Sequence, residues 1–361
     1  MRVVAKIGTS SITDARGAIN VEMVDSLCQQ VAQLRDVGHE VLVVTSGAVA
    51  GGVAALGLAA RPSDTATLQA LAAAGQSRLM GHYNTGLERF GLIGAQVLLV
   101  PNDFINRSQY LHARQTMLRL LELGCVPVIN ENDAIASDEI RFGDNDRIAA
   151  LVAHSVNADL LVLLTDRAGL YTADPQTDPS ATLVEHVSVD DALMTVRAGT
   201  TVSGVGSGGM ASKLAAARIA SWSGVRTVIA AANRAQVLRD AVEGKRGIGT
   251  TFAAHDRSLT ARKLWIAFAA QPTGSVTIDE GARNALVSRA VSLLHAGVIN
   301  VSGDFVAGDV VDVLSGSGEL IARGLVRTDA RIASAAAGKK STELPDDVPT
   351  ELVHRDDLIV Y

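Results

Sequence analysis

Residues 3–11 read VVAKIGTSS and pass from a β-branched apolar run straight into a glycine and three hydroxyl residues. The apolar part predicts a buried strand. The glycine lets the backbone approach a ligand closely, and Lys6 with the hydroxyl groups suits a phosphate. For this segment taken alone, a tight turn beside a surface lysine is an equally good interpretation. The segment does not contain the G-x-x-x-x-G-K-[ST] pattern of a Walker A loop.

Similar apolar runs recur along the chain and alternate with helical patterns. We expect strands at residues 3–6, 40–44, 95–100, 126–129, 160–164 and 227–230, and helices at residues 21–37, 65–90, 109–123, 148–158 and 210–223. Repeated strand–helix–strand units predict an α/β fold with a largely parallel sheet flanked by helices. In such sheets ligands bind at the carboxyl ends of the strands, so the residues that follow each strand are the candidates for function.

The pattern changes after residue 252. Residues 253–261 are polar and aperiodic, as in a linker, and short strand-like runs with glycine turns follow at 263–267, 275–278, 298–301, 309–314 and 320–326. Closely spaced short strands are typical of a small β-barrel-like domain. Residues 339–349 are polar and predict a loose segment. We therefore expect two domains, at residues 1–254 and 262–361.

Composition narrows the class of protein. Of the 361 residues 48% are hydrophobic, which is enough for a sizeable core, and a net charge of −6 disfavours a nucleic-acid surface. Cys28 and Cys125 form no CxxC pair, so we expect neither a zinc site nor a disulfide. We see no signal peptide and no apolar stretch of membrane-spanning length, so we expect a cytoplasmic protein without a membrane partner.

Two strand ends carry groups that suit an amino acid. The segment TSGAVAGG, residues 45–52, opens a helix directly after a strand, and its amides with Ser46 form an anion pocket suited to a carboxylate. Capping by Thr45 or Ser46 explains that segment slightly better when it is taken alone. The segment NENDA, residues 130–134, is more polar than a cap requires. Its amides and acids can hold an ammonium group and a carboxylate together, which favours a substrate site that includes Asp133.

The segment RFGDNDR, residues 141–147, stands just before the helix predicted at 148–158. Asp144 or Asn145 is expected to cap that helix. Three consecutive Asp and Asn residues exceed what a cap needs. We therefore expect substrate contact here, or orientation of a lysine by Asp146.

Two further segments suit a nucleotide. In LLTDRAGLYTADP, residues 163–175, Thr165 and Asp166 precede a glycine turn that can wrap a base or ribose, although ordinary turn chemistry is compatible with the same residues. In SGVGSGGMASK, residues 203–213, four glycines lead into a helix. Lys213 near the helix N-terminus opposes the helix dipole unless an anion neutralises it. This misfit favours a phosphate cradle over a merely mobile loop.

The eight histidines are scattered, without a His-x-x-x-His pair or a cysteine partner, and no G-x-S-x-G segment is present. The histidines are therefore expected to be structural or exposed. We name no metal-ligating residue and leave open whether Mg²⁺ has direct protein ligands. The sequence gives no support to hydrolase chemistry.

Together, the strings AKIGTSS, VVTSGAVAGG, PVINENDAI, RFGDND, LLTDRAGLYTADP and GSGGMASKLAAA resemble the amino acid kinase family, and within it the glutamate 5-kinases, in the family's order over most of residues 2–252. Residues 279–282 and 353–357 resemble the PUA domain that is often appended to these enzymes. Related kinases of aspartate, acetylglutamate, carbamate and uridylate share the glycine-rich segments and the lysine after the first strand. The TSGAV, NENDAI and GDND strings with a PUA-like tail are the more specific part of the resemblance.

The resemblance implies roles for individual residues. Lys6 and Lys213 would contact the ATP phosphates and the transferred group, and Asp146 would orient both lysines. The residues implied for glutamate are Ser46, Asp133 and Asn145. Those implied for the nucleotide are Lys6, Thr165, Asp166, Ser207, Gly208, Gly209, Met210, Ala211, Ser212 and Lys213. Ser212 stands where the family tends to have threonine, which keeps the hydroxyl group.

The resemblance also implies the reaction, which is phosphorylation of the side-chain carboxylate of L-glutamate by ATP with Mg²⁺, the first step of proline biosynthesis. That carboxylate is ionised at neutral pH, since its reference pKa is about 4.3, so no general base is required. Charge neutralisation and in-line positioning become the main tasks of the enzyme. Feedback inhibition by proline and a homo-oligomer are expected on the same ground.

Two rival functions stay open at this point. One is a kinase for another carboxylate, such as aspartate or N-acetylglutamate. The other is an RNA-binding or RNA-modification factor, because PUA-like domains occur in such proteins. Residues 262–361 contain 10 Lys and Arg against 13 Asp and Glu, and an acidic domain is a poor polyanion binder.

Overall fold

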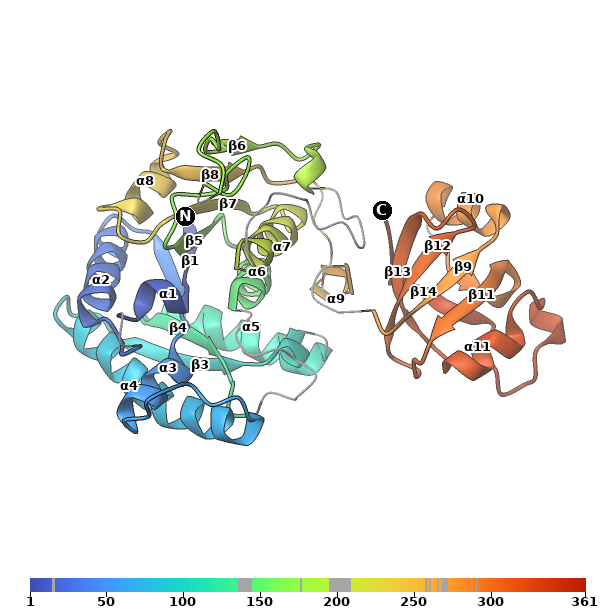
Figure 1. Ribbon diagram of the computed structural model, residues 1–361, viewed down its shortest axis with the longest axis horizontal. Helices are drawn as coiled ribbons and strands as arrows, with labels where there is room; N and C mark the ends of the chain where they lie inside the picture. Colours follow the sequence, from blue (N-terminus) through green and yellow to red (C-terminus); the bar gives the residue numbers. More distant parts are fainter. Residues whose placement is uncertain are drawn as a thin grey trace. The chain divides into compact units, whose positions relative to one another are not determined.

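The computed structural model describes residues 1–14, 17–104, 106–135, 145–175, 177–194, 209–256, 259, 261–264, 266–267, 272–289 and 291–361. The described residues up to Asp256 form one compact unit, and those from Leu259 to Tyr361 form a second (Figure 1).

The first unit alternates strands and helices. Its strands are β1 (Arg2–Ile7), β2 (Glu40–Val44), β3 (Gly94–Leu99), β4 (Val126–Glu131), β5 (Leu160–Thr165), β6 (His186–Val187), β7 (Arg226–Ala231) and β8 (Gly249–Phe252). Its α-helices are α1 (Thr9–Ile12), α2 (Val21–Asp36), α3 (Ala48–Ala55), α4 (Thr65–Glu88), α5 (Arg107–Glu122), α6 (Asn145–Ser155), α7 (Gly209–Trp222) and α8 (Val237–Glu243), with short 3₁₀ helices at Pro101–Phe104 and Ala192–Met194. The strands form one sheet in the order β3-β4-β2-β1-β5-β7-β8-β6. Neighbouring strands are parallel except β7 and β8, which confirms the prediction of a largely parallel sheet.

Helices cover both faces of this sheet, as its uniformly apolar strands require. Alternate residues of β1, namely Val3, Ala5 and Ile7, are buried in a core shared with α2, α4 and α8. The helices α6 and α7 lie on the other face, where α6 packs against β1 and β5 (Figure 1). Side chains alternate along a strand, so Lys6 points to the face that α6 and α7 cover.

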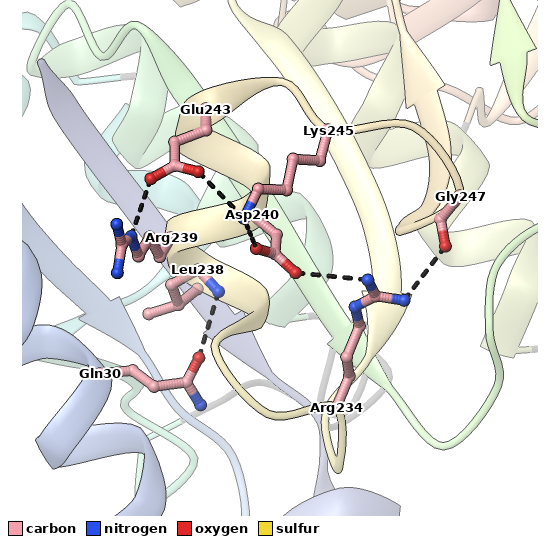
Figure 2. Close-up of polar contacts among 8 residues, drawn as sticks. All are labelled: Gln30, Arg234, Leu238, Arg239, Asp240, Glu243, Lys245 and Gly247. Carbon is pink, nitrogen blue, oxygen red and sulfur yellow. Dashed lines mark hydrogen bonds and ion pairs between the residues drawn. The ribbon is translucent and has the colours of Figure 1, made fainter.

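The helix α8 is tied to α2 by a side chain distant in sequence. Gln30 of α2 accepts a hydrogen bond at 3.1 Å from the backbone N–H of Leu238 in the first turn of α8 (Figure 2). Asp240 accepts from Lys245 at 2.6 Å and pairs with Arg234 at 3.3 Å. These bonds fix both ends of the segment that leads into β8, which lies next to the candidate site described below.

The second unit contains a six-stranded sheet in the order β10-β14-β13-β12-β9-β11. Its strands are β9 (Gly274–Ile278), β10 (Leu293–Leu294), β11 (Val298–Gly303), β12 (Val310–Ser315), β13 (Leu320–Val326) and β14 (Glu351–Val360). Its helices are α9 (Ala261–Leu264), α10 (Glu280–Ser288) and α11 (Ala330–Ala336), with 3₁₀ turns at His295–Gly297 and Ser341–Glu343. Asp279 and Asp329 cap α10 and α11. The unit has its own apolar core around Val276, Val311 and Leu352.

Three local predictions are wrong. The strand predicted at 263–267 is not found among its described residues, since Lys263 and Leu264 belong to α9 and the buried side chains of Ile266 and Ala267 pack against β12, β13 and β14. An apolar run this short does not distinguish a strand from a buried helical segment. The helix predicted at 148–158 begins at Asn145 and ends at Ser155, so Asn145 lies inside it, and Asp144, the other expected cap, lies outside the described residues. Neither Thr45 nor Ser46 caps α3, because the N-cap is Gly47 at φ 102°.

Two glycines let α3 and α4 cross with their backbones almost in contact. A Cβ on Gly75 of α4 would lie 1.8 Å from the carbonyl oxygen of Ala48, and one on Gly52 of α3 would lie 2.0 Å from that of Leu71. Both neighbours are backbone atoms, so the whole helices would have to separate. The position of α3, which starts directly after β2, therefore depends on these two residues.

We predict that Gly75→Ala lowers the free energy of unfolding by about 1–3 kcal/mol or more, because overpacking displaces a whole helix. The matched control is Gly81→Ala in the same helix, where no atom lies within 4 Å of the added Cβ. That variant should gain about 0.5–1 kcal/mol from helix propensity. Urea unfolding of both variants measures the difference, and equal midpoints would contradict the close crossing.

Candidate active site

The carboxyl ends of four adjacent strands, β4, β2, β1 and β5, carry the polar residues singled out in the sequence. Lys6 is in register with Val44 of β2 and Leu163 of β5, and Val44 is in register with Ile129 of β4. Asp133, Ser46, Lys6 and Thr165 therefore follow one another along a single edge of the sheet. Sequence segments up to 160 residues apart are brought together in this way.

Three charged residues form the centre of the site. The Asp146 carboxylate lies 2.6 Å from the Lys6 ammonium through one oxygen and 3.3 Å from the Lys213 ammonium through the other. Lys6, Asp146 and Lys213 come from β1, α6 and α7, and all three side chains are buried, at 4%, 4% and 9% exposure. Asp146 sits in the first turn of α6, where the helix dipole favours a negative charge.

The protonation state of this cluster follows from its charges. Burial raises the pKa of Asp146, but the two ammonium groups lower it by more, so the net pKa lies below its usual range. Asp146 is therefore an anion at neutral pH, and the three groups together carry one net positive charge. A buried positive charge is costly unless an anion neutralises it. A phosphate group bound beside Lys6 and Lys213 would add to this neutralisation.

A first cavity, of about 240 Å³, lies at the end of β5. Of the residues expected at a nucleotide, five line it: Thr165, Asp166, Gly209, Met210 and Lys213. Ala211 and Ser212 belong to α7 but are not among the lining residues, and Ser207 and Gly208 lie outside the described residues. The same holds for residues 141–144 of the RFGDND segment.

The wall of this cavity is held from behind by β8. The Thr250 hydroxyl accepts a hydrogen bond at 2.8 Å from the backbone N–H of Leu170, in the turn after β5. A Cβ on Gly169 would lie 2.7 Å from that hydroxyl oxygen, and one on Gly249 would lie 2.8 Å from the carbonyl oxygen of Ala168. The turn therefore packs directly on the β8 backbone, which the network of Figure 2 positions from the other end.

A second cavity, of about 570 Å³, lies on the other side of β1, within the size range of small-molecule sites. Ser46, Asp133 and Asn145, the residues that the family resemblance implies for glutamate, all line it. Thr9 faces this cavity while the adjacent Ser10 faces the first one. The glycine–hydroxyl segment after β1 thus separates the two cavities, with the Lys6–Asp146–Lys213 cluster at the same strand end.

The orientation of the Asn145 side chain follows from its partner. The backbone N–H of Glu131 donates to Asn145 Oδ1 at 3.0 Å. A backbone N–H can only donate, so the atom facing it must be the amide oxygen and not the nitrogen. The Asn145 NH₂ group is left to donate elsewhere, and the residue lines the second cavity. This arrangement suits recognition of a carboxylate.

Asp133 has an unusual acidity for an aspartate. Burial raises its pKa from 3.8 to about 6, against the opposing effect of the Arg61 guanidinium. At neutral pH the carboxylate is mostly ionised, and an ammonium group bound beside it would complete its neutralisation. This environment favours a cationic ligand group.

Sequence reasoning missed several lining residues. Arg61 lines the second cavity, and Arg167 and Asp174, 3.5 Å apart, line the first. Asp174 was part of a quoted motif, but Arg61 stands in a loop between alanines and a proline, where a charge indicates only solvent exposure. Nothing in the local pattern could have identified it.

Comparison with known proteins supplies the family. The model of the amino acid kinase family matches residues 1–231, and the PUA domain model matches residues 274–346. The chain is 46% identical over 99% of its length to a glutamate 5-kinase of Thermobifida fusca (93% of that protein is covered), and 47% identical over 99% to one of Frankia casuarinae (96% covered). The first unit also has the fold of a Giardia lamblia carbamate kinase bound to AMP-PNP, at TM-score 0.51 and 15% identity over 70% of this chain and 98% of that one.

The described part of the chain was compared with the features of membrane-spanning helices and of metal-binding side-chain groups. Within the described ranges, no helix is long and apolar enough to cross a membrane. Among the same residues, no three His, Cys, Asp or Glu side chains gather as a metal-binding group.

The family models match the first unit and the C-terminal part of the chain, and the curated relatives align along nearly the whole sequence. The chain therefore belongs to the amino acid kinase family.

Proposed function

We propose that the chain transfers the γ-phosphoryl group of ATP to the side-chain carboxylate of L-glutamate, giving L-glutamyl 5-phosphate and ADP, the first step of proline biosynthesis. The observation that carries the proposal is the buried Lys6–Asp146–Lys213 cluster at the strand end between the two cavities. The family and the glutamate 5-kinase relatives support the same reaction.

The chemistry needs positioning and charge more than proton transfer. A γ-carboxylate oxygen of glutamate attacks the γ-phosphorus while the bond to the β–γ bridging oxygen breaks, and ADP leaves. The nucleophile is already ionised, so no base is used. Lys6 and Lys213 neutralise the negative charge on the transferring group, and Asp146 holds both ammonium groups in place and keeps them apart.

The remaining site residues divide between donor and acceptor. Thr165, Asp166 and the start of α7 hold the nucleotide in the first cavity, together with the Ser207–Lys213 segment expected from the sequence. In the second cavity Asn145 donates to the reacting carboxylate and Ser46 adds the hydroxyl. Asp133 pairs with the α-ammonium group.

The residues present fit a Mg²⁺ ion that is carried mainly by ATP. This ion keeps several waters and binds proteins through one or two carboxylates plus phosphate oxygens. Asp166, exposed and lining the first cavity, is the carboxylate that would hold it. Bound there, the ion would supply further charge neutralisation on the phosphates.

We extend the proposal to the organisation of the protein. Residues 1–254 form the catalytic domain and residues 262–361 a PUA-like domain, and the enzyme is a cytoplasmic homo-oligomer inhibited by proline. Sedimentation of the full chain, and its activity with increasing proline, test the last two points. A monomer, or activity indifferent to proline, would reject them separately.

The purified protein should release ADP only when L-glutamate, ATP and Mg²⁺ are present together. The acyl phosphate is trapped with hydroxylamine as the hydroxamate, which is measured by its iron complex. Turnover with N-acetyl-L-glutamate or L-aspartate equal to that with L-glutamate would reject the assignment of the acceptor.

Replacement of either central lysine should slow the chemical step. Lys6→Ala and Lys213→Ala should each lower kcat about 10²–10³-fold, because each removes a charge that stabilises the transition state. The control is Lys339→Ala, an exposed lysine of the second unit, which should leave kcat unchanged. Losses below tenfold in both site variants, with unchanged melting temperature, would refute the role of the cluster.

Binding of glutamate should depend on pH through Asp133. Because burial raises its pKa to about 6, the carboxylate is ionised above that pH and becomes protonated below it. We expect kcat/KM for glutamate to fall about tenfold per pH unit below about pH 6. Asp133→Asn should lower kcat/KM at pH 8 and flatten this limb, and comparison of the two proteins removes any titration of ATP. An unchanged limb in the variant would assign it to another group.

A further inference from the structure

Among the residues that the structure describes, the charged side chains that line the second cavity are those of Arg61 and Asp133. The rest of the lining is small, apolar or hydroxyl-bearing, apart from the Asn145 amide. Arg61 lies in the connection between α3 and α4 and is exposed. Its guanidinium acts on the Asp133 carboxylate, whose pKa it lowers.

These charges match those of a free α-amino acid with an acidic side chain. Such a ligand carries an ammonium group and two carboxylates. Asp133 is the counterpart of the ammonium, and Asn145 with Ser46 is the counterpart of the reacting carboxylate. The α-carboxylate is the third charged group of the ligand, and Arg61 is the cation that lines the cavity among the residues that the structure describes.

The order of strands separates the two carboxylates. Ser46 follows β2, which pairs directly with β1, so it lies beside the strand end that carries Lys6. Asp133 follows β4, on the opposite side of β2. The two steps from β1 to β4 span about 10 Å at about 4.8 Å per strand. The amino acid end of the ligand therefore lies toward β4, and the Arg61 guanidinium is close enough to Asp133 to affect its charge.

We propose that Arg61 binds the α-carboxylate of the substrate and makes the enzyme select free L-glutamate over compounds in which that group is an amide, such as an N-terminal glutamyl residue of a peptide. This inference rests on the proposed function. Guanidinium and carboxylate form a paired, charge-assisted contact that an amide cannot reproduce.

The test compares two substrates and three variants of the full-length protein. L-Isoglutamine keeps the ammonium group and the γ-carboxylate of L-glutamate but carries a neutral amide in place of the α-carboxylate. Arg61→Gln should lower kcat/KM for L-glutamate about 10- to 100-fold, mainly through KM, and leave the lower kcat/KM for L-isoglutamine nearly unchanged. Arg61→Lys should recover part of the loss because it restores the charge without the paired donors.

Arg78→Gln serves as the matched control, since it removes the same charge from an exposed arginine of α4 that does not line the cavity. It should leave kcat/KM unchanged for both substrates. A further readout is the acid limb of kcat/KM for L-glutamate. Arg61 lowers the pKa of Asp133, so Arg61→Gln should shift that limb to higher pH.

The outcomes separate the two proposals. If the wild-type protein forms no hydroxamate with L-glutamate, the proposed function fails and this inference fails with it. Suppose that the wild type is active. If Arg61→Gln then lowers kcat/KM equally for both substrates, or lowers it no more than Arg78→Gln does, only the role of Arg61 is overturned. Selective loss with L-glutamate establishes it.

Discussion

One buried carboxylate, that of Asp146, is the interaction on which the site depends. It lies between two buried ammonium groups that would otherwise repel each other in a medium of low polarity. Lys6 comes from the first strand and Lys213 from a helix more than 200 residues later, so the cluster also ties α6 and α7 to the sheet. In the proposed reaction, the two ammonium groups would neutralise charge on the phosphoryl group. Folding stability favours full pairing of these buried charges, whereas the proposed reaction requires positive charge that a phosphoryl group can contact.

The order of strands converts this cluster into a transfer site. The first cavity lies at the end of β5 and the second spans the ends of β2 and β4, with β1 between them. A parallel sheet places all these strand ends at one edge, which is why polar residues far apart in sequence converge. The glycine crossing of α3 and α4 and the Gln30–Leu238 bond act at a distance, by fixing the elements that form the cavity walls.

Most of the architecture could be predicted because buried parallel strands have a strong sequence signature. The strands of the first unit were found to within one or two residues, except the short β6 and β8, which carry too few residues to form a pattern. Predictions failed where one sequence pattern is compatible with two structures. The apolar residues near Ile266 suited either a strand or a buried helical segment, and Asn145 suited a cap but instead bonds Glu131 of β4. Such partners depend on the tertiary structure and leave no local trace.

Candidate site residues could be predicted where polar residues interrupt an apolar pattern, as at Asn130–Asp133. They could not be predicted where a charged residue is ordinary for an exposed loop, as at Arg61. This difference bears on how the enzyme selects one of two carboxylates in the same substrate. A cluster with one net positive charge attracts either carboxylate, so the centre alone does not choose. Choice requires a second cation at a fixed distance, with Asp133 setting the position of the ammonium group between them. If Arg61 binds the α-carboxylate as proposed, an exposed arginine on a loop would favour the orientation in which the other carboxylate faces the buried residues of the cluster.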